Sequence, residues 1–220
     1  MKMKALIFDM DGTLVDSLGG WEVLWAACSK EYLGGKPFSL TPEDDHVVRT
    51  LTLKDALELV HKNYGIAESG EALLNFTNDF FKNFYITDVK LKEGVREFLD
   101  YCLKNGIKMC MASATAPILL NVAVSHHDLG KYFCKIFSCA DIGIGKERPD
   151  IFLMAKDYMG EALEDTWVVE DSLTALKTAR DAGFNTIGIF DCHTPRQDEI
   201  EAVSTIYIDD GETLNKVIDL

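Results

Sequence analysis

The chain has 220 residues, of which 47% are hydrophobic and 26% are charged. This balance is typical of a globular protein with one large domain or one domain with an insertion, and it excludes a disordered or collagen-like chain. Asp and Glu number 36 against 22 Lys and Arg, which gives a net charge of −14. Because an acidic surface repels phosphate backbones, we expect no nucleic-acid partner. A small phosphorylated substrate remains compatible, since one Mg²⁺ or one lysine reverses the field inside a pocket.

The apolar runs and the cysteines bear on where the protein works. The run Ala5–Phe8 near the N-terminus is too short for the hydrophobic region of a signal peptide. No apolar run approaches the roughly 18 residues that a membrane span needs. The six cysteines include no CxxC pair and match no zinc-binding spacing. We therefore expect a cytoplasmic protein without membrane contact or structural disulfides.

Six short apolar runs are typical of parallel strands that are buried on both faces. They are Lys4–Phe8, Ile107–Ala112, Lys135–Cys139, Thr166–Val169, Thr186–Phe190 and Thr205–Ile208. Helical periodicity separates most of these runs, and several helical stretches end at a glycine, as at Gly106, Gly160 and Gly183. Strands that alternate with helices predict an α/β fold, a doubly wound parallel sheet.

Residues 17–85 interrupt this alternation, because they show helical periodicity and no pattern typical of a strand. Asp16 or Ser17 is a candidate N-terminal cap for the first helix, since a side-chain oxygen there can accept a hydrogen bond from a free N–H group. The apolar faces of three expected helices are Trp21, Leu24, Trp25 and Cys28; Leu53, Leu57 and Val60; and Leu73, Phe76, Phe80 and Phe84.

This helical segment is too long for a simple crossover between two strands. We therefore expect an all-helical cap domain of residues 17–88, inserted into an α/β core domain of residues 1–16 and 89–220. The expected hinges are Asp16–Leu18 and Thr87–Glu93.

Charged and polar side chains follow the expected strands where ligands bind in open α/β sheets, beyond the carboxyl ends. The first strand is followed by Asp9 and Asp11, and the fourth by Glu170 and Asp171. Four carboxylates in one pocket repel each other unless a cation compensates. Mg²⁺, which prefers oxygen ligands and a substrate phosphate, is the cofactor that we expect.

The same strand ends suggest how a phosphate ester could react. Asp9 can attack phosphorus as a carboxylate nucleophile and form an aspartyl-phosphate. Asp11 can act as general acid toward the leaving oxygen and then as base toward water. Ser113 follows the second strand and Lys146 lies beyond the third, so both can hold the non-bridging phosphoryl oxygens. We also expect Gly12, Thr13 and Ala114, which lie beside these residues, to bind the substrate.

In this order the motifs resemble those of the haloacid dehalogenase (HAD) superfamily. They are ALIFDMDGTLVDS at the N-terminus, MCMASAT around Ser113, GKERPDIF around Lys146 and VVEDS at residues 168–172. The resemblance covers essentially the whole chain and is greatest to phosphoglycolate phosphatases and β-phosphoglucomutases. It implies Asp9 as nucleophile and Asp11 as acid/base, with Mg²⁺ held by Asp9, the Asp11 main-chain carbonyl and Asp171, helped by Glu170. The third motif more often reads Lys-Pro-x-Pro, whereas Glu147 stands at its first Pro position here.

Several chemistries occur in this superfamily, and individual residues favour one of them. Asp11 argues against dehalogenases and phosphonatases, because both lack the second Asp. Trp21 stands where the β-phosphoglucomutases place a cap histidine, and Leu53 and Thr50 stand at their cap arginine and glycine, although Arg49 lies nearby, as does Lys54. We therefore expect a phosphatase of a small phosphorylated metabolite, with a sugar-phosphate mutase as the alternative and a non-catalytic binding module as the third hypothesis.

Substrate choice should depend on the cap, because the core offers only phosphate and metal ligands. The candidate side chains are Trp21, Trp25, His46, Arg49 and Lys54, although we expect the two tryptophans to be packed in the cap core and the two cations to be solvated. His126 and His127 are poor joint metal ligands, because adjacent residues on a helix point apart. The expected oligomeric state is a monomer or a homodimer.

Overall fold

The computed structural model describes residues 3–48 and 53–218. The chain divides into two units. We call Met1–Leu18 together with Asp88–Leu220 the α/β unit, and Gly19–Thr87 the helical unit. The expected division into a cap domain of residues 17–88 and a core domain of residues 1–16 and 89–220 remains a prediction.

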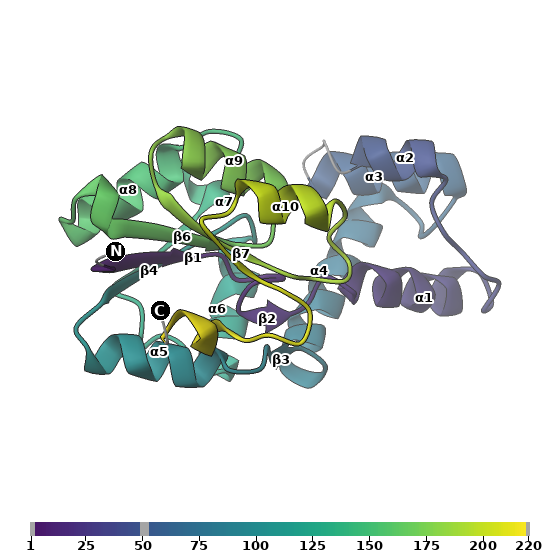
Figure 1. Ribbon diagram of the computed structural model, residues 1–220. Coiled ribbons are helices and arrows are strands. Elements are labelled where there is room, and N and C mark those ends of the chain that lie inside the picture. The colour runs from purple at the N-terminus through teal and green to yellow at the C-terminus, as the bar shows by residue number, and fades with distance from the viewer. Residues whose placement is uncertain (1–2, 49–52, 219–220) are drawn as a thin grey trace. The chain divides into compact units, whose positions relative to one another are not determined.

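A six-stranded parallel sheet with the order β5-β4-β1-β6-β7-β8 forms the centre of the α/β unit (Figure 1). Its strands are β1 (Ala5–Phe8), β4 (Lys108–Ser113), β5 (Lys135–Ser138), β6 (Thr166–Glu170), β7 (Asn185–Ile189) and β8 (Ile206–Ile208). Each lies within two residues of a predicted run at both ends. The central strand β1 pairs with β4 on one side and β6 on the other, so that Phe8 lies opposite Met111 and Val169.

Both faces of the sheet are covered, which explains why its strands are continuous apolar runs. On one face, Ala5 and Ile7 of β1 join a buried cluster with residues of α8 (Asp150–Met159) and α9 (Leu173–Asp181). On the other face, Phe8 contacts Phe98 of α5 (Val95–Lys104) edge to face, with ring centroids 6.2 Å apart. Figure 1 shows α8 and α9 above the sheet and α5 below it. Further helices of this unit are α6 (Pro117–His126), α7 (Cys139–Ile142), α10 (Gln197–Val203) and the short 3₁₀ helices η1 (Leu163–Asp165) and η2 (Leu214–Val217).

A two-stranded antiparallel ribbon of β2 (Val15–Asp16) and β3 (Lys90–Leu91) was not predicted. Two residues are too few to show the alternation by which a strand is recognised in a sequence.

The ribbon also shows that the expected cap on the first helix is wrong. Asp16 belongs to β2, Ser17 donates a hydrogen bond to Asp11, and the helix begins only at Gly20, after Gly19.

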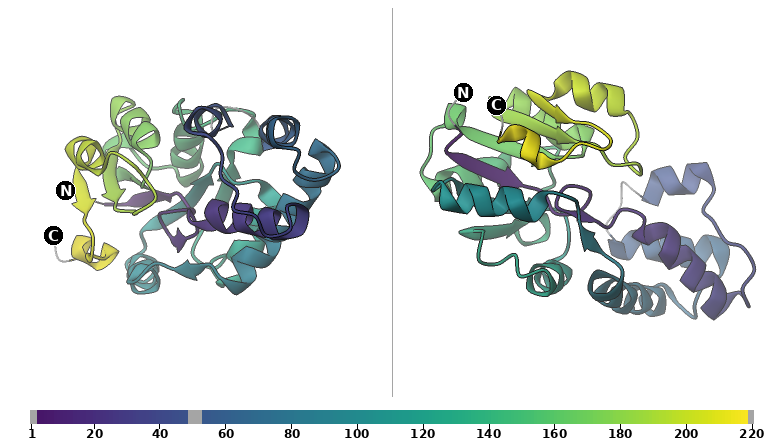
Figure 2. Two further views of the ribbon diagram at one scale, coloured as in Figure 1. Left: turned by 90° about the vertical axis from the view of Figure 1, so that its right-hand side faces the viewer. Right: turned by 60° about the horizontal axis from the view of Figure 1, so that its bottom comes forward.

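The described part of the helical unit consists of helices and connecting segments, as the two views of Figure 2 show in purple to blue. These helices are α1 (Gly20–Tyr32), α2 (Pro42–Val48), α3 (Leu53–Tyr64) and α4 (Gly70–Thr87). The buried face of α4 holds Phe81 and Phe84, whereas Phe80, which the sequence pattern assigned to that face, is only half-buried. Trp21 of α1 is 41% exposed, so the expected burial of this side chain in the helical core is wrong.

The predicted fold class, a doubly wound parallel α/β sheet with an inserted helical segment, is confirmed. None of the helices in residues 3–48 and 53–218 combines the length and the apolar character that crossing a membrane requires.

Candidate active site

Three carboxylates meet at the carboxyl edge of the sheet. Asp9 follows β1, Glu170 is the last residue of the neighbouring strand β6, and Asp171 comes directly after it. One oxygen from each of the three carboxyl groups lies within 4.8 Å of the other two, and all three residues are buried. The expectation that Asp9, Glu170 and Asp171 lie together is therefore met by the geometry.

Lys146 brings a positive charge into this group from the loop between α7 and α8. Its ammonium group donates to Oδ1 of Asp9 and, at 2.5 Å, to Oε1 of Glu170. Glu170 is held further by the main-chain N–H of Ser172, which donates to Oε2 at 2.9 Å. Burial disfavours the charged form of Lys146, but the charges of Asp9 and Glu170 outweigh it and hold the lysine pKa above its ordinary value. The lysine is therefore a fixed cation at pH 7.

The buried acids differ from solvated carboxyl groups in how they titrate. Burial raises the pKa of Asp9 to about 7. The charge of Lys146 opposes this shift, whereas the charges of Glu170 and Asp11 add to it. Burial and then the charge of Asp9 raise the pKa of Asp171 to about 7. The pKa of Glu170 is raised too, mainly by burial. When ionised, the three buried carboxyl groups therefore carry more negative charge than the single positive charge of Lys146 neutralises.

This donor set fits a hard divalent cation. All three groups offer carboxylate oxygens, which are the ligands that such cations prefer, and no nitrogen or sulfur ligand belongs to the cluster among the described residues. A divalent charge would also relieve the repulsion among these acids, which adds to the larger effect of burial in raising the pKa of Asp9 and of Asp171. Asp11 was predicted to bind the metal through its main-chain carbonyl, and accordingly its carboxylate is not needed in this cluster of side-chain oxygens, which consists of Asp9, Glu170 and Asp171 among the described residues.

The Asp11 carboxylate lies instead between two hydroxyl donors. Ser17 Oγ donates to Oδ1 at 2.6 Å, and Thr115 Oγ1 donates to Oδ2 at 2.5 Å. Ser17 comes just after β2, and Thr115 lies two residues beyond the end of β4, so the two donors approach from different parts of the chain. One hydroxyl on each oxygen fixes the orientation of the carboxyl group.

Gly12 lets the chain turn tightly beside Asp171. Its backbone is left-handed, with φ +80°, and its N–H donates to the carbonyl of Val15 at 2.9 Å. A Cβ atom on Gly12 would lie 2.7 Å from Cγ of Asp171, which is closer than real side chains approach. Thr13 follows, and its hydroxyl donates to Oδ1 of Asp171 at 3.1 Å. Gly12 and Thr13, both expected to bind substrate, thus also shape the place of Asp171.

Ser113 ends β4 and is buried, and its hydroxyl accepts a hydrogen bond from the N–H of Thr115 at 3.1 Å. Ala114 lies in the bend between these two residues and is exposed. The bend is fixed by Ser138, whose hydroxyl donates to the carbonyl of Thr115 at 2.9 Å. The expected substrate-binding segment therefore has an ordered main chain at the carboxyl end of β4.

Sequence reasoning missed three side chains of this site. Thr115 could have been found, because it follows Ser113 at a predicted strand end. Ser17 was interpreted as a helix cap, and Thr194, which donates to Oδ2 of Asp171 at 2.8 Å, lies in a loop with no recognisable motif. Of the expected selectivity residues, Arg49 lies outside the described residues, as does the side chain of His46. Thr50, which stands at the position of the mutase glycine, lies outside them too.

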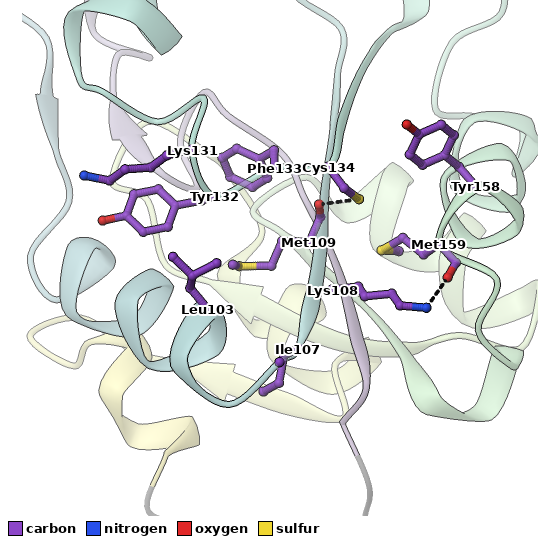
Figure 3. A pocket seen from close by; sticks show the side chains of 11 residues that line it. Leu103, Ile107, Lys108, Met109, Lys131, Tyr132, Phe133, Cys134, Tyr158 and Met159 are labelled. Carbon is purple, nitrogen blue, oxygen red and sulfur yellow. Dashed lines mark hydrogen bonds between the residues drawn. The ribbon is translucent and has the colours of Figure 1, made fainter.

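A separate cleft opens at the amino ends of β4 and β5 (Figure 3). Cys134 and Met109 face it, and the Cys134 thiol donates to the carbonyl of Met109 at 3.0 Å. Lys108 and Met159 also line it, and Lys108 Nζ donates to the carbonyl of Met159 at 2.7 Å. None of the candidate catalytic residues lines this cleft.

Comparisons with known proteins place the chain among hydrolases. The family of haloacid dehalogenase-like hydrolases matches residues 3–183. The phosphorylated carbohydrates phosphatase of Thermotoga maritima is 26% identical over 215 residues, 97% of each chain. Hexitol phosphatase A of Escherichia coli is 27% identical over 207 residues, 92% of this chain and 91% of that one. A solved structure from Thermotoga maritima, provisionally described as a β-phosphoglucomutase, has a TM-score of 0.83 at 25% identity and covers 99% of this chain and 100% of its own.

Proposed function

Because this chain belongs to the haloacid dehalogenase-like hydrolases, we propose that it is a Mg²⁺-dependent phosphatase of a small phosphorylated metabolite. The observation that carries the proposal is the buried group of Asp9, Glu170 and Asp171, into which Lys146 donates two hydrogen bonds. A carboxylate nucleophile, a fixed cation and a metal-compatible acid cluster at one sheet edge are the components that phosphoryl transfer requires.

Asp9 is the nucleophile in this mechanism. One of its carboxylate oxygens attacks phosphorus, the bond from phosphorus to the ester oxygen breaks, and an aspartyl-phosphate forms. The leaving oxygen takes a proton from Asp11. Water then attacks phosphorus and gives its proton to Asp11, which releases inorganic phosphate and restores the Asp9 carboxylate. Asp11 suits both steps, because Ser17 and Thr115 hold its carboxyl group in one orientation.

Lys146 and Ser113 hold the phosphoryl group, assisted by the main chain around Gly12, Thr13 and Ala114. Lys146 is suited to this task because its charge is fixed and its ammonium already lies against the nucleophile. The buried position of these groups excludes water and strengthens each charge interaction with the transferring phosphoryl oxygens.

Asp9, Glu170, Asp171 and the main-chain carbonyl of Asp11 would hold Mg²⁺. When bound, the ion supplies positive charge that offsets the negative charge of the phosphoryl group. The fit rests on the all-oxygen donor set and on the excess of buried carboxylate described above.

A phosphorylated sugar or sugar alcohol is the substrate class that the relatives favour. Two proteins similar along most of the chain are named as phosphatases of phosphorylated carbohydrates and of hexitol compounds. We propose that this chain acts on a free metabolite of that class in the cytoplasm. The net charge of −14 is consistent with a small substrate rather than a nucleic acid.

A sugar-phosphate mutase is the second candidate, favoured by the similarity to the structure described as a β-phosphoglucomutase. Two positions in the helical unit argue for the phosphatase. Trp21 and Leu53 stand where the resemblance would place a mutase histidine and arginine.

The decisive experiment measures phosphate release from a panel of phosphorylated metabolites, with Mg²⁺ or EDTA present. We expect release that needs Mg²⁺ and that Asp9→Asn lowers by a factor on the order of 10³ or more, because this substitution removes the nucleophile. Interconversion of sugar phosphates that depends on a bisphosphate primer, with little phosphate release, would instead show the mutase. Mg²⁺ binding without turnover of any compound would contradict both activities.

A further inference from the structure

An ion pair and several side-chain hydrogen bonds hold the loop that follows β7 at the carboxyl edge of the sheet. Asp191 within it is only 3% exposed. One of its oxygens forms an ion pair with Lys92 Nζ at 2.8 Å, and the other accepts the N–H of His193 at 2.9 Å. Lys92 also donates to the carbonyl of Phe190 at 2.9 Å. The start of the loop is thereby joined to the segment just after β3.

The other end of the loop is fixed by Gln197, the first residue of α10. Its amide group donates to the carbonyls of Asp191 and Thr194, at 2.8 Å in each case. Tyr207 of β8 donates in turn to the side-chain oxygen of Gln197 at 2.8 Å. The N–H of Thr194 donates to the carbonyl of Asp191 at 3.0 Å, which closes a tight turn.

This turn places one hydroxyl at the candidate active site. Thr194 Oγ1 donates to Oδ2 of Asp171 at 2.8 Å, while Thr13 Oγ1 donates to Oδ1 at 3.1 Å. Each oxygen of Asp171 thus accepts one hydroxyl hydrogen bond. A carboxylate fixed at both oxygens presents its remaining lone pairs in one direction and loses less freedom when it binds a cation.

We propose that Thr194 is a positioning residue that orients Asp171 for Mg²⁺ binding, and that the Lys92–Asp191 pair holds Thr194 in place. The inference rests on the function proposed above. It assigns a role to a part of the chain that lies beyond residue 183, where the match to the hydrolase family ends. The route runs from Lys92 to Asp191, through the tight turn to Thr194, and from its hydroxyl to Asp171.

The first test measures Mg²⁺ binding to the full chain by isothermal titration calorimetry. Thr194→Val keeps the shape of the side chain and removes the hydroxyl, and we expect about tenfold weaker binding. Thr194→Ser keeps the hydroxyl and should bind within about twofold of the unchanged chain. Thr205→Val is the matched control, because it also removes a threonine hydroxyl. That hydroxyl accepts the N–H of Thr186 near the amino end of β7, at the edge of the sheet opposite to the candidate active site.

The outcomes separate the two proposals. If the unchanged chain binds Mg²⁺ and Thr194→Val binds it equally well, the positioning role of Thr194 is wrong and the phosphatase proposal stands. If the unchanged chain binds no Mg²⁺, both are wrong. If Thr205→Val weakens binding as much as Thr194→Val, the effect comes from general destabilisation, and the positioning role is likewise wrong.

The second test asks whether Asp191 acts through Thr194. We expect Asp191→Asn to weaken Mg²⁺ binding several-fold, and the double variant Thr194→Val/Asp191→Asn to bind as Thr194→Val does. Asp165→Asn is the control, because it breaks an ion pair with Lys4 at the amino end of β1. Independent effects that multiply in the double variant would show that Asp191 does not act through Thr194.

Discussion

Ser17 donates a hydrogen bond to Asp11 across only six residues of sequence, with its Oγ 2.6 Å from Oδ1 of Asp11. Between them the chain passes through the left-handed turn at Gly12 and then through β2. Because Ser17 is the next residue after β2, its hydroxyl depends on how that short strand is held. The proposed acid/base is therefore oriented by the segment that leads out of the α/β unit.

Removing this hydroxyl should slow turnover without weakening substrate binding. We expect Ser17→Ala to lower kcat by about fivefold, which corresponds to about 1 kcal/mol for one hydrogen bond, and to leave KM nearly unchanged. Thr115→Val should act in the same direction, because it removes the donor to the other oxygen of Asp11. Steady-state kinetics would check both, with Ser204→Ala as a control whose hydroxyl donates to a helix carbonyl. Unchanged kcat in both variants would contradict the orienting role.

A side chain at Gly12 should damage the metal site more than the fold. Gly12→Ala has two unfavourable effects. An alanine in this left-handed backbone conformation costs about 1–2 kcal/mol, and its Cβ atom would lie 2.7 Å from Cγ of Asp171. Gly211→Ala meets only the first, since its φ is +76° and no atom lies within 4 Å of its Cβ position. We expect both to lower the free energy of unfolding, but only Gly12→Ala to abolish Mg²⁺ binding in calorimetry. Equal Mg²⁺ binding by the two variants would show that Asp171 tolerates displacement.

The buried acids predict how pH changes the stability of the metal-free chain. In the folded state the pKa of Asp9 and the pKa of Asp171 are each raised to about 7, from ordinary values of 3.8. Between these values the folded state binds more protons than the unfolded state, so these two groups lower stability as pH rises from about 4 to about 7. Mg²⁺ competes with the protons, so it should stabilise the chain more at about pH 8 than at about pH 5.

Thermal unfolding with and without Mg²⁺ at both pH values would test this expectation. In Asp9→Asn one of the two titrating groups is gone, so the pH dependence of the Mg²⁺ effect should shrink. An increase in Tm on adding Mg²⁺ that is the same at both pH values would argue against raised carboxyl pKa values in the folded chain.

The thiols should fall into two kinetic classes. Cys134 and Cys192 are exposed, whereas the other four cysteines are buried. Burial raises the pKa of Cys28 to about 11 and that of Cys102 to about 12, which suppresses the reactive thiolate. We expect two thiols to react rapidly with a disulfide reagent in the native chain and all six to react after unfolding. Rapid reaction of more than two would show that the buried thiols are open to solvent.

The parallel sheet could be predicted from the sequence because both of its faces are covered. Strands such as Ala5–Phe8 then consist of apolar residues throughout and end abruptly at a charged one, Asp9. Neighbouring parallel strands deliver their carboxyl ends to one edge, and this is why the meeting of Asp9 with Glu170 and Asp171 could be anticipated. The two-residue strands β2 and β3 give no such pattern, and they were missed.

The side chains that orient the acids were harder to predict. Ser17 precedes a helix and has the chemistry of a helix cap, and only the pairing of β2 with β3 directs its hydroxyl to Asp11 instead. Thr194 reaches Asp171 through a loop whose shape depends on contacts with Lys92 and Tyr207. Lys92 lies about a hundred residues from Thr194 along the chain, and Tyr207 lies thirteen residues from it. Such tertiary contacts leave no trace in local periodicity.

The ribbon of β2 and β3 has the form of a hairpin stem. Val15 pairs with Leu91 and Asp16 with Lys90 in antiparallel register, so the whole helical unit occupies the place of a hairpin turn. A two-residue turn could close such a stem without shifting the strands on either side. Grafting a different helical insert onto the stem would leave the register of the parallel sheet as it is. Any such graft must leave Ser17, which precedes the helical unit, in place, or Asp11 loses its hydrogen bond from that hydroxyl.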